Sequence, residues 1–204
     1  MIEIKNLTKV YKDRAVLDIE SLVVEKGECI VLTGHNGSGK STFLKILAGT
    51  LKESSGGIKK EGKVCYLPQQ CIPFNKSVRR NITFCLDGSR KSKNALCDVI
   101  LKAFGLNHLE HKNAKTLSGG ECQRLCLARV LSKKADIVLL DEPTSAADKE
   151  SRAIINRLIS DYRKQTGCTV IMTSHTDEIP DFDKVKIIKL CDGKITEIRE
   201  ESNA

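Results

Sequence analysis

The chain reads ECIVLTGHNGSGKSTFLKIL from residue 28 to residue 47. Its first six residues are a short, mostly apolar run typical of a buried strand, and apolar residues recur at helical spacing after residue 41. Between these two patterns, residues 34–41 fit G-x-x-x-x-G-K-[ST]. Glycines let successive backbone N–H groups turn toward an anion, and the following helix adds its positive end. The stretch predicts a phosphate-binding loop.

The side chains of this loop predict how it would hold a nucleotide. Lys40 can reach the β- and γ-phosphates, and Ser41 can ligate magnesium. A glycine-rich turn without a ligand is the alternative interpretation. The residues expected to bind the nucleotide here are Gly34, Asn36, Gly37, Ser38, Gly39, Lys40, Ser41 and Thr42.

A second pattern places two carboxylates after an apolar strand. Residues 137–140 are Ile-Val-Leu-Leu, and Asp141, Glu142 and Pro143 follow them. Asp141 is expected to hold magnesium, and Glu142 is expected to polarise the attacking water as a general base. Taken alone, the stretch could equally be a strand that ends in a solvated acidic turn.

The rest of the chain alternates strand and helix patterns, which favours an α/β fold with a largely parallel sheet. The first thirty residues suggest short strands, with breaks at residues 18–20 and 26–27. Residues 71–116 have a mostly helical pattern and predict an inserted subdomain. The expected strands cover residues 28–33, 63–67, 136–141, 169–173 and 185–190, and the expected helices cover 41–51, 121–131 and 150–162.

Composition limits the class of protein. A chain of 204 residues, 40% hydrophobic and 29% charged, is expected to form one globular domain or one core with a subdomain. No apolar run approaches the roughly 20 residues of a membrane span, and the first twelve residues lack the features of a secretory signal. The net charge of +8 is spread along the chain without interleaved aromatic residues, which favours a solvated basic surface.

The nine cysteines are an odd number and include no C-x-x-C pair. Most have apolar neighbours, so we expect reduced cysteines that act as small hydrophobic residues in a cytosolic protein. Cys122 and Cys126 share a face of an expected helix. A metal site there is disfavoured, because no histidine is near in sequence.

A third pattern, Leu117-Ser118-Gly119-Gly120-Glu121, stands directly before an expected helix. It predicts either a helix cap alone or a second anion site at a helix N-terminus. Together with the other two motifs, and in this order, the pentapeptide resembles the signature of the ATP-binding-cassette (ABC) ATPases.

The resemblance extends over nearly the whole chain and implies one ABC ATPase domain, residues 1–204. Its parts would be a RecA-like P-loop core with a parallel sheet, an N-terminal antiparallel β subdomain and an inserted helical subdomain. The core and β subdomain would take residues 1–70 and 121–204, and the helical subdomain residues 71–120.

Further site residues follow from this resemblance. Tyr11 resembles the aromatic residue that stacks on adenine. Gln69 resembles the glutamine that touches magnesium and couples to the partner, although Gln70 beside it leaves the position open by one residue. His175 resembles the switch histidine that contacts the γ-phosphate, so it joins Glu142 and Gln69 as a catalytic candidate.

Two departures from the family pattern concern neighbouring positions. The loop of residues 145–148, which ends in Asp148, resembles the family loop that contacts the other subunit, but Ala147 stands where the family usually has leucine. His35 stands where the family often has proline, and no role is assigned to it.

The resemblance implies that ATP and Mg²⁺ bind one chain and that Ser118, Gly119 and Gly120 of a second copy close the site. A homodimer would therefore form with ATP and open after hydrolysis. The expected function is an ATP-hydrolysing subunit that powers transport of an unidentified substrate through a separate transmembrane permease, from the cytoplasmic face of the membrane. Gln69 and the helical region after it would form the surface that contacts the permease.

The alternative function is a non-transport ABC ATPase that acts on nucleic acid or a ribosomal partner. Three features weigh against it: the stretch from Lys40 to Ser118 is too short for a long coiled coil, the chain has one cassette, and the basic residues form no stripe. Direct binding of nucleic acid is therefore not expected. Small P-loop kinases are disfavoured, because they lack the signature at residues 117–121.

Overall fold

A six-stranded sheet with the order β5-β6-β7-β3-β8-β9 forms the centre of the computed structural model, which describes residues 1–145, 147–174 and 182–202. The five strands from β5 to β8 are parallel, and β9 pairs with β8 in the antiparallel sense. This confirms the α/β fold class. The strands of this sheet are β3 (Cys29–Thr33), β5 (Val64–Leu67), β6 (Ile137–Leu140), β7 (Thr169–Thr173), β8 (Lys184–Cys191) and β9 (Lys194–Ser202).

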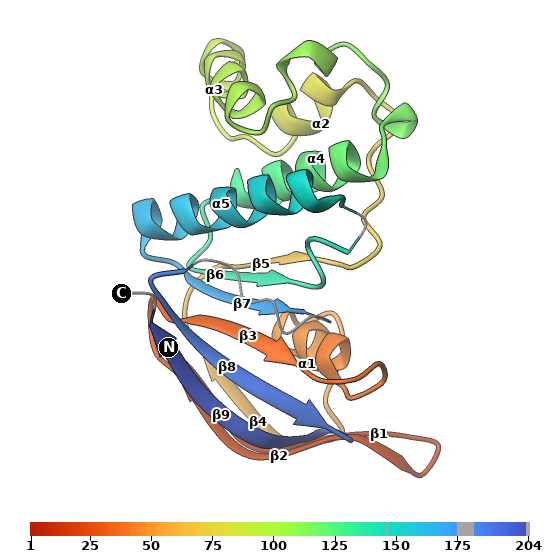
Figure 1. Ribbon diagram of the computed structural model, residues 1–204, viewed down its shortest axis with the longest axis vertical. Helices are drawn as coiled ribbons and strands as arrows, with labels where there is room; N and C mark the ends of the chain where they lie inside the picture. Colours follow the sequence, from red (N-terminus) through yellow and green to blue (C-terminus); the bar gives the residue numbers. More distant parts are fainter. Residues whose placement is uncertain (146, 175–181, 203–204) are drawn as a thin grey trace.

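Both faces of the central strands are buried, as is usual for a parallel sheet covered on two sides. In β6, Val138 and Leu140 join one hydrophobic cluster, whereas Ile137 and Leu139 join the other. Helices α4 (Gly119–Leu131) and α5 (Lys149–Thr166) cover the first face. Helix α1 (Lys40–Leu47) and the second sheet cover the other (Figure 1). The uninterrupted apolar run of β6 is therefore explained by burial on both sides.

The second sheet is antiparallel and has the order β2-β1-β4. It consists of β1 (Ile2–Tyr11), β2 (Arg14–Val24) and β4 (Ser55–Lys60). The expected break at residues 18–20 is wrong, because β2 runs through it. Leu17 and Ile19 both point into the core, as every second residue of a strand does, and Asp18 between them pairs with Thr8 of β1. The turn expected at residues 26–27 is present.

The region between β5 and α4 contains helices α2 (Val78–Thr83) and α3 (Arg90–Ala103) and two short 3-10 turns at 107–109 and 114–116. These helices lie beyond α4, on the side away from the sheet (Figure 1). The buried Asn81 side chain accepts a hydrogen bond from the Phe74 N–H and donates to the Phe74 carbonyl, which fixes the entry into α2. The proposed limits of the helical subdomain at residues 71 and 120 stay a prediction.

Among the described residues, no helix combines the length and apolar character that a bilayer crossing requires.

One disulfide bond corrects the sequence-based expectation for the cysteines. Cys71 and Cys126 are joined, with their Cα atoms 6.3 Å apart, so the prediction that all nine cysteines are reduced is wrong for this pair. Cys122, one turn before Cys126, donates from its thiol to the Cys71 carbonyl oxygen at 3.8 Å. The pair could not be predicted, because 55 residues separate the two cysteines and only the packing of residue 71 on α4 brings them together.

The disulfide predicts a thiol count and a stability change. Under denaturing, non-reducing conditions the chain should show seven thiols, against nine after reduction. Cys71→Ser should lower the free energy of unfolding by about 2–4 kcal/mol, because the cross-link restricts the unfolded chain. Thiol titration and urea denaturation measure the two effects, and Cys65→Ser, at a free half-buried cysteine, is the control. Nine thiols without reduction would contradict the bond.

Candidate functional site

The expected phosphate loop connects β3 to α1, and two of its glycines are required by the packing around them. Gly34 has a φ of 137°, and a Cβ there would lie 2.1 Å from the Leu190 carbonyl oxygen. Gly39 precedes α1 with a φ of 106°, and a Cβ there would lie 2.8 Å from the Val16 carbonyl oxygen. The loop is therefore held in a tight curve by neighbouring backbone that leaves no room for side chains at these positions.

Two buried polar side chains in the loop have the character of phosphate ligands. Lys40 is 5% exposed, and its ammonium donates to the carbonyl oxygens of Gly34 and His35 at 2.6 and 3.0 Å. Burial lowers the pKa of Lys40, while the nearby Glu142 and Asp141 carboxylates act in the opposite direction. The Ser38 hydroxyl is buried without a hydrogen-bond partner among the described residues. Both groups suit an anionic ligand in the curve of the loop.

The carboxylate of Asp141 is held by three hydroxyl groups. Ser41 and Thr173 donate to Oδ1 at 2.9 and 3.0 Å, and Tyr66 donates to Oδ2 at 3.1 Å. Burial raises the pKa of Tyr66, and the negative charge of Asp141 raises it further. Ser41 and Asp141 therefore meet directly, although 100 residues separate them in the chain.

Glu142 is buried at the end of β6 with a φ of 50°, a left-handed backbone conformation that is uncommon outside glycine. Its N–H donates to the Thr173 hydroxyl at 2.7 Å. The Gln69 side-chain amide donates to Glu142 Oε2, also at 2.7 Å. Non-glycine residues held in such conformations cluster at functional sites.

A cleft of about 330 Å³ brings these groups together. It lies between the phosphate loop, the start of α1 and the residues that follow β5 and β6. Its lining contains most of the loop residues expected to bind the nucleotide, together with Gln69 and Glu142. The lining residues are Val16, Asn36, Gly37, Gly39, Lys40, Ser41, Thr42, Gln69 and Glu142.

Other predicted site residues lie outside the lining of this cleft. Ser118 caps α4 in a capping box with Glu121, and Ser118 and Gly119 are exposed, with Gly120 half-buried. Asp148 is exposed and caps α5. These positions face solvent in a single chain.

Tyr11 lies at the end of β1, 46% exposed, where the Lys9 ammonium is 4.9 Å from the centre of its ring. His175 and Ala146 lie outside the described residues.

Sequence reasoning missed three residues of the site. Tyr66 and Thr173 hold Asp141 through strands that neighbour β6, and Val16 of β2 lines the cleft. The sequence around Tyr66 contains one indication of its role, a polar hydroxyl within an apolar strand. The sequence around Thr173 and Val16 contains no such indication, because their roles depend on which strands are adjacent.

The donor set fits a nucleotide and a magnesium ion. Hydroxyl, carboxylate and amide oxygens, such as those of Ser41, Asp141 and Gln69, are the hard ligands that magnesium accepts. The curved loop with the Lys40 ammonium and the Ser38 hydroxyl fits phosphate oxygens.

A phosphate loop between a central parallel strand and a helix, facing a buried carboxylate pair at the end of another strand, defines the P-loop nucleoside triphosphatases. Within this class, residues 17–145 match the family model described as ABC transporter. The chain therefore belongs to the ABC transporter family and is an ATPase that binds ATP, which confirms the family indicated by the three sequence motifs.

Curated relatives and solved structures agree with this assignment. The chain is 36% identical over 196 residues to the aliphatic sulfonates import ATP-binding protein SsuB 1 of Streptomyces avermitilis, covering 95% of this chain and 74% of that protein. It is 37% identical over 177 residues to the zinc import ATP-binding protein ZnuC of Vibrio vulnificus, covering 86% and 67%. A dimeric ATP-binding cassette in a post-hydrolysis state, bound to ADP and Pi, matches with a TM-score of 0.87 and 27% identity, covering 99% and 98%.

Proposed function

We propose that this chain hydrolyses ATP to drive an unidentified substrate through a separate membrane permease. The observation that carries the proposal is that Lys40, Ser41, Gln69 and Glu142 line one cleft, with Asp141 hydrogen-bonded to Ser41. The purified chain should release phosphate from ATP only when Mg²⁺ is present, and chelation with EDTA should abolish the activity. Hydrolysis that persists in EDTA would contradict this use of the cleft.

The mechanism we propose assigns one task to each side chain of the cleft. Lys40 binds the β- and γ-phosphates, and the loop N–H groups hold the remaining phosphate oxygens. Ser41, Asp141 and Gln69 would hold magnesium, which supplies positive charge against the charge on the phosphates. Glu142 accepts a proton from the attacking water at its carboxylate while the oxygen of that water attacks the γ-phosphorus. The bond to ADP breaks, and inorganic phosphate leaves.

Gln69 is well placed to report on this step. Its amide donates to the same carboxylate, Glu142 Oε2, that would take up the proton. Protonation of Glu142 weakens it as an acceptor, so the contact with Gln69 depends on the state of the nucleotide. The chain then continues from Gln69 toward α2, which gives a direct route from the cleft to the helical region.

We propose that two copies close the site head to tail. Ser118, Gly119 and Gly120 are accessible at the start of α4, where backbone N–H groups can bind the γ-phosphate held by the other chain. Asp148 is exposed at the start of α5 and would contact the same partner. The dimeric state of a similar cassette supports this arrangement. Tyr11 would stack on adenine, and His175 would contact the γ-phosphate.

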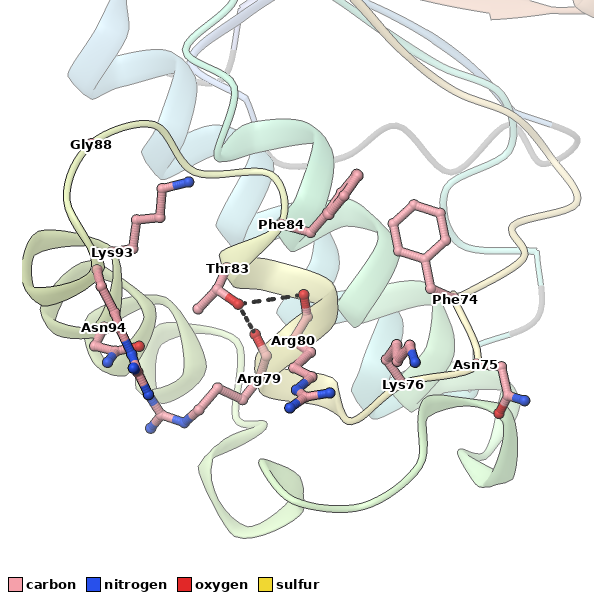
Figure 2. A pocket seen from close by; sticks show the side chains of 11 residues that line it. Phe74, Asn75, Lys76, Arg79, Arg80, Thr83, Phe84, Gly88, Lys93 and Asn94 are labelled. Atoms are coloured by element: carbon pink, nitrogen blue, oxygen red, sulfur yellow. Dashed lines mark hydrogen bonds between the residues drawn. The ribbon is translucent and has the colours of Figure 1, made fainter.

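A groove of about 1120 Å³ on the helical region is the surface that we propose for the permease. Figure 2 shows Phe74 and Phe84 next to each other, with Lys76 and Arg80 on the adjoining part of the groove and Arg79 extending toward α3. The two ring centres are 5.1 Å apart. Phe84 is 73% exposed and Phe74 is 41% exposed. Exposed aromatic residues beside cations fit a partner segment that carries both apolar and acidic side chains.

Phe84→Glu tests this surface. The introduced carboxylate removes the apolar contact and repels an acidic partner segment. Binding of the permease should weaken by about 30-fold or more, the effect of losing an interface hot spot of 2 kcal/mol. ATP hydrolysis by the isolated chain should not change, because Phe84 is remote from the cleft. Co-purification with the permease and phosphate release measure the two effects.

Ile198→Glu is the matched control. Ile198 is also exposed and apolar, but it lies on β9, away from the groove. It should leave permease binding intact. Equal losses in the two variants would contradict the assignment of the groove.

The proposed location is the cytoplasmic side of the membrane, where the permease would hold the chain. We further propose import as the direction, because the relatives at 36% and 37% identity are named as import proteins. Those relatives are named for sulfonates and for zinc, so they do not define the substrate. Right-side-out vesicles that contain the permease, with this chain and ATP enclosed on the cytoplasmic face, test the direction. Import predicts that they take up the substrate, and export predicts that they do not.

A further inference from the structure

Three metal-ligating side chains from distant parts of the sequence meet beside the phosphate loop. His35 Nε2 lies 3.9 Å from Cys191 Sγ and 3.6 Å from Asp192 Oδ1, and Cys191 Sγ lies 3.8 Å from Asp192 Oδ2. One ligand atom from each residue lies within 4.8 Å of the others. His35 belongs to the phosphate loop, whereas Cys191 and Asp192 belong to the turn between β8 and β9.

The backbone holds these two segments against each other. Cys191 pairs with Lys194, so Asp192 and Gly193 form a two-residue hairpin turn, both with positive φ, at 46° and 80°. The Gly193 N–H donates to the Ser38 carbonyl oxygen of the phosphate loop at 3.0 Å. A Cβ at Gly193 would lie 2.5 Å from the Val16 carbonyl oxygen, so the approach of the turn requires glycine. The cluster therefore sits on a rigid contact.

The orientation of the imidazole suits a metal ligand. His35 Nδ1 lies 2.8 Å from the Asn36 carbonyl oxygen, which can only accept a hydrogen bond, so Nδ1 carries the proton. In the neutral ring, Nε2 then bears the lone pair, and it faces the thiol and the carboxylate. A backbone carbonyl that fixes the second nitrogen in this way is the usual outer partner of a metal-bound histidine.

The distances agree with a tetrahedral site. With zinc bonds of about 2.3 Å to sulfur and about 2.0–2.1 Å to nitrogen or oxygen, tetrahedral ligands lie about 3.6 Å apart when one is sulfur and about 3.3 Å apart otherwise. The His35–Cys191 separation of 3.9 Å exceeds the first value by about 0.3 Å. The distances of 3.6 Å to His35 and 3.8 Å to Cys191 are to the two different oxygens of Asp192, so this carboxylate must turn for one oxygen to serve both contacts. Small side-chain rotations would close the difference.

We propose that His35, Cys191 and Asp192 bind a zinc-class divalent cation, with a fourth position open to solvent. The thiolate and the carboxylate would balance the two positive charges, and the mixed nitrogen, sulfur and oxygen set suits a borderline metal such as Zn²⁺ better than Mg²⁺. The His35 and Asp192 side chains are 54% and 80% exposed, so an ion can enter from solvent. The bound ion would join the phosphate loop to the β8–β9 turn.

A surface ion pair between His35 and Asp192 is the competing explanation. Such an exposed pair contributes about 0–1 kcal/mol and would not need the thiol. The structure contains a matched pair of that kind: His111 Nε2 lies 3.1 Å from Glu110 Oε1, and no cysteine completes a ligand group there within the described residues.

Titration with Co²⁺, followed by displacement with Zn²⁺, tests the site. The nucleotide-free chain is kept without reductant, so that the Cys71–Cys126 bond stays closed, and with Mg²⁺ in excess to fill oxygen sites. We expect one equivalent of Co²⁺ to give a thiolate charge-transfer band and the intense visible bands of tetrahedral cobalt. Zn²⁺ should abolish both and should raise the melting temperature, because it binds only the folded chain.

Substitutions then identify the ligands. Cys191→Ser should remove the charge-transfer band, and Cys191→Ser and His35→Gln should each weaken cobalt binding by at least about 100-fold, beyond the 10–100-fold cost of losing an outer partner. His111→Gln and Cys65→Ser should bind as the unaltered chain does, and circular dichroism checks each fold. The proposal is wrong if the unaltered chain gives no thiolate band, or if Cys191→Ser retains it.

Discussion

Glu142→Gln should reduce ATP hydrolysis by about 10²–10⁴-fold, the usual share of a positioned general base. The amide keeps the length of the side chain but cannot take a proton from water. Its carbonyl oxygen can still accept the hydrogen bond that Gln69 donates to Glu142 Oε2. Lys40, Ser41 and Asp141 are unchanged, so ATP should still bind. Phosphate release in the presence of ATP and Mg²⁺ measures the effect.

The same variant should accumulate as an ATP-bound dimer, because the nucleotide that joins the two copies is no longer removed. Size-exclusion chromatography with ATP and Mg²⁺ should show the larger species, and the nucleotide-free chain should elute as a monomer. Glu150→Gln, at an exposed position in the first turn of α5, is the control and should hydrolyse normally. Normal hydrolysis by Glu142→Gln would move the base to another residue, whereas an inactive variant that never dimerises would contradict the role of Ser118 and Gly120.

Lys40→Ala should weaken ATP binding by at least about 30-fold. Truncating one member of a buried charge pair costs about 2–5 kcal/mol, and Lys40 is 5% exposed beneath the loop. The fold should remain, because Phe43 and Leu44, which anchor α1 in the core, are not altered. Nucleotide titration measures the affinity, and circular dichroism checks the fold.

Lys45→Ala provides the matched control for this variant. Lys45 lies on the same helix, α1, but is exposed on the face away from the core. Its removal changes the net charge equally and should leave ATP affinity unaltered. If both variants lost affinity to the same extent, the effect would be one of overall charge, and the loop assignment would fail.

The parts of the fold that could be predicted from sequence are those encoded in contiguous residues. The phosphate loop, the acidic pair and the buried parallel strands each have a local pattern, and β7 was predicted at the bounds the structure gives, Thr169–Thr173. Strands β4 and β9 could not be predicted, because they are edge strands with little apolar content. In β9 most residues are polar or charged, among them Glu197 and Arg199.

The contacts that complete the site could not be predicted, because they depend on which strands are adjacent. Asp141 meets Tyr66 and Thr173 only because β5 and β7 flank β6. No pattern along the chain gives that order. The cluster at His35 and Cys191 has the same origin, since β8 lies next to β3 and brings its turn to the phosphate loop.

The Cys71–Cys126 bond changes the route by which a displacement can travel through the molecule. Along the chain, Gln69 and the turn at Ser118 are separated by the whole α2–α3 excursion. Through the cross-link, Cys71 lies two residues from Gln69, and about 12 Å of helix α4 leads from Cys126 back to Ser118. A hydrogen-bonded helix transmits axial displacement with little loss, so movement at the nucleotide cleft can reach Ser118, where we propose that a second copy binds. Helix α2 packs against α4, so a partner that displaces α2 would act on this same connection.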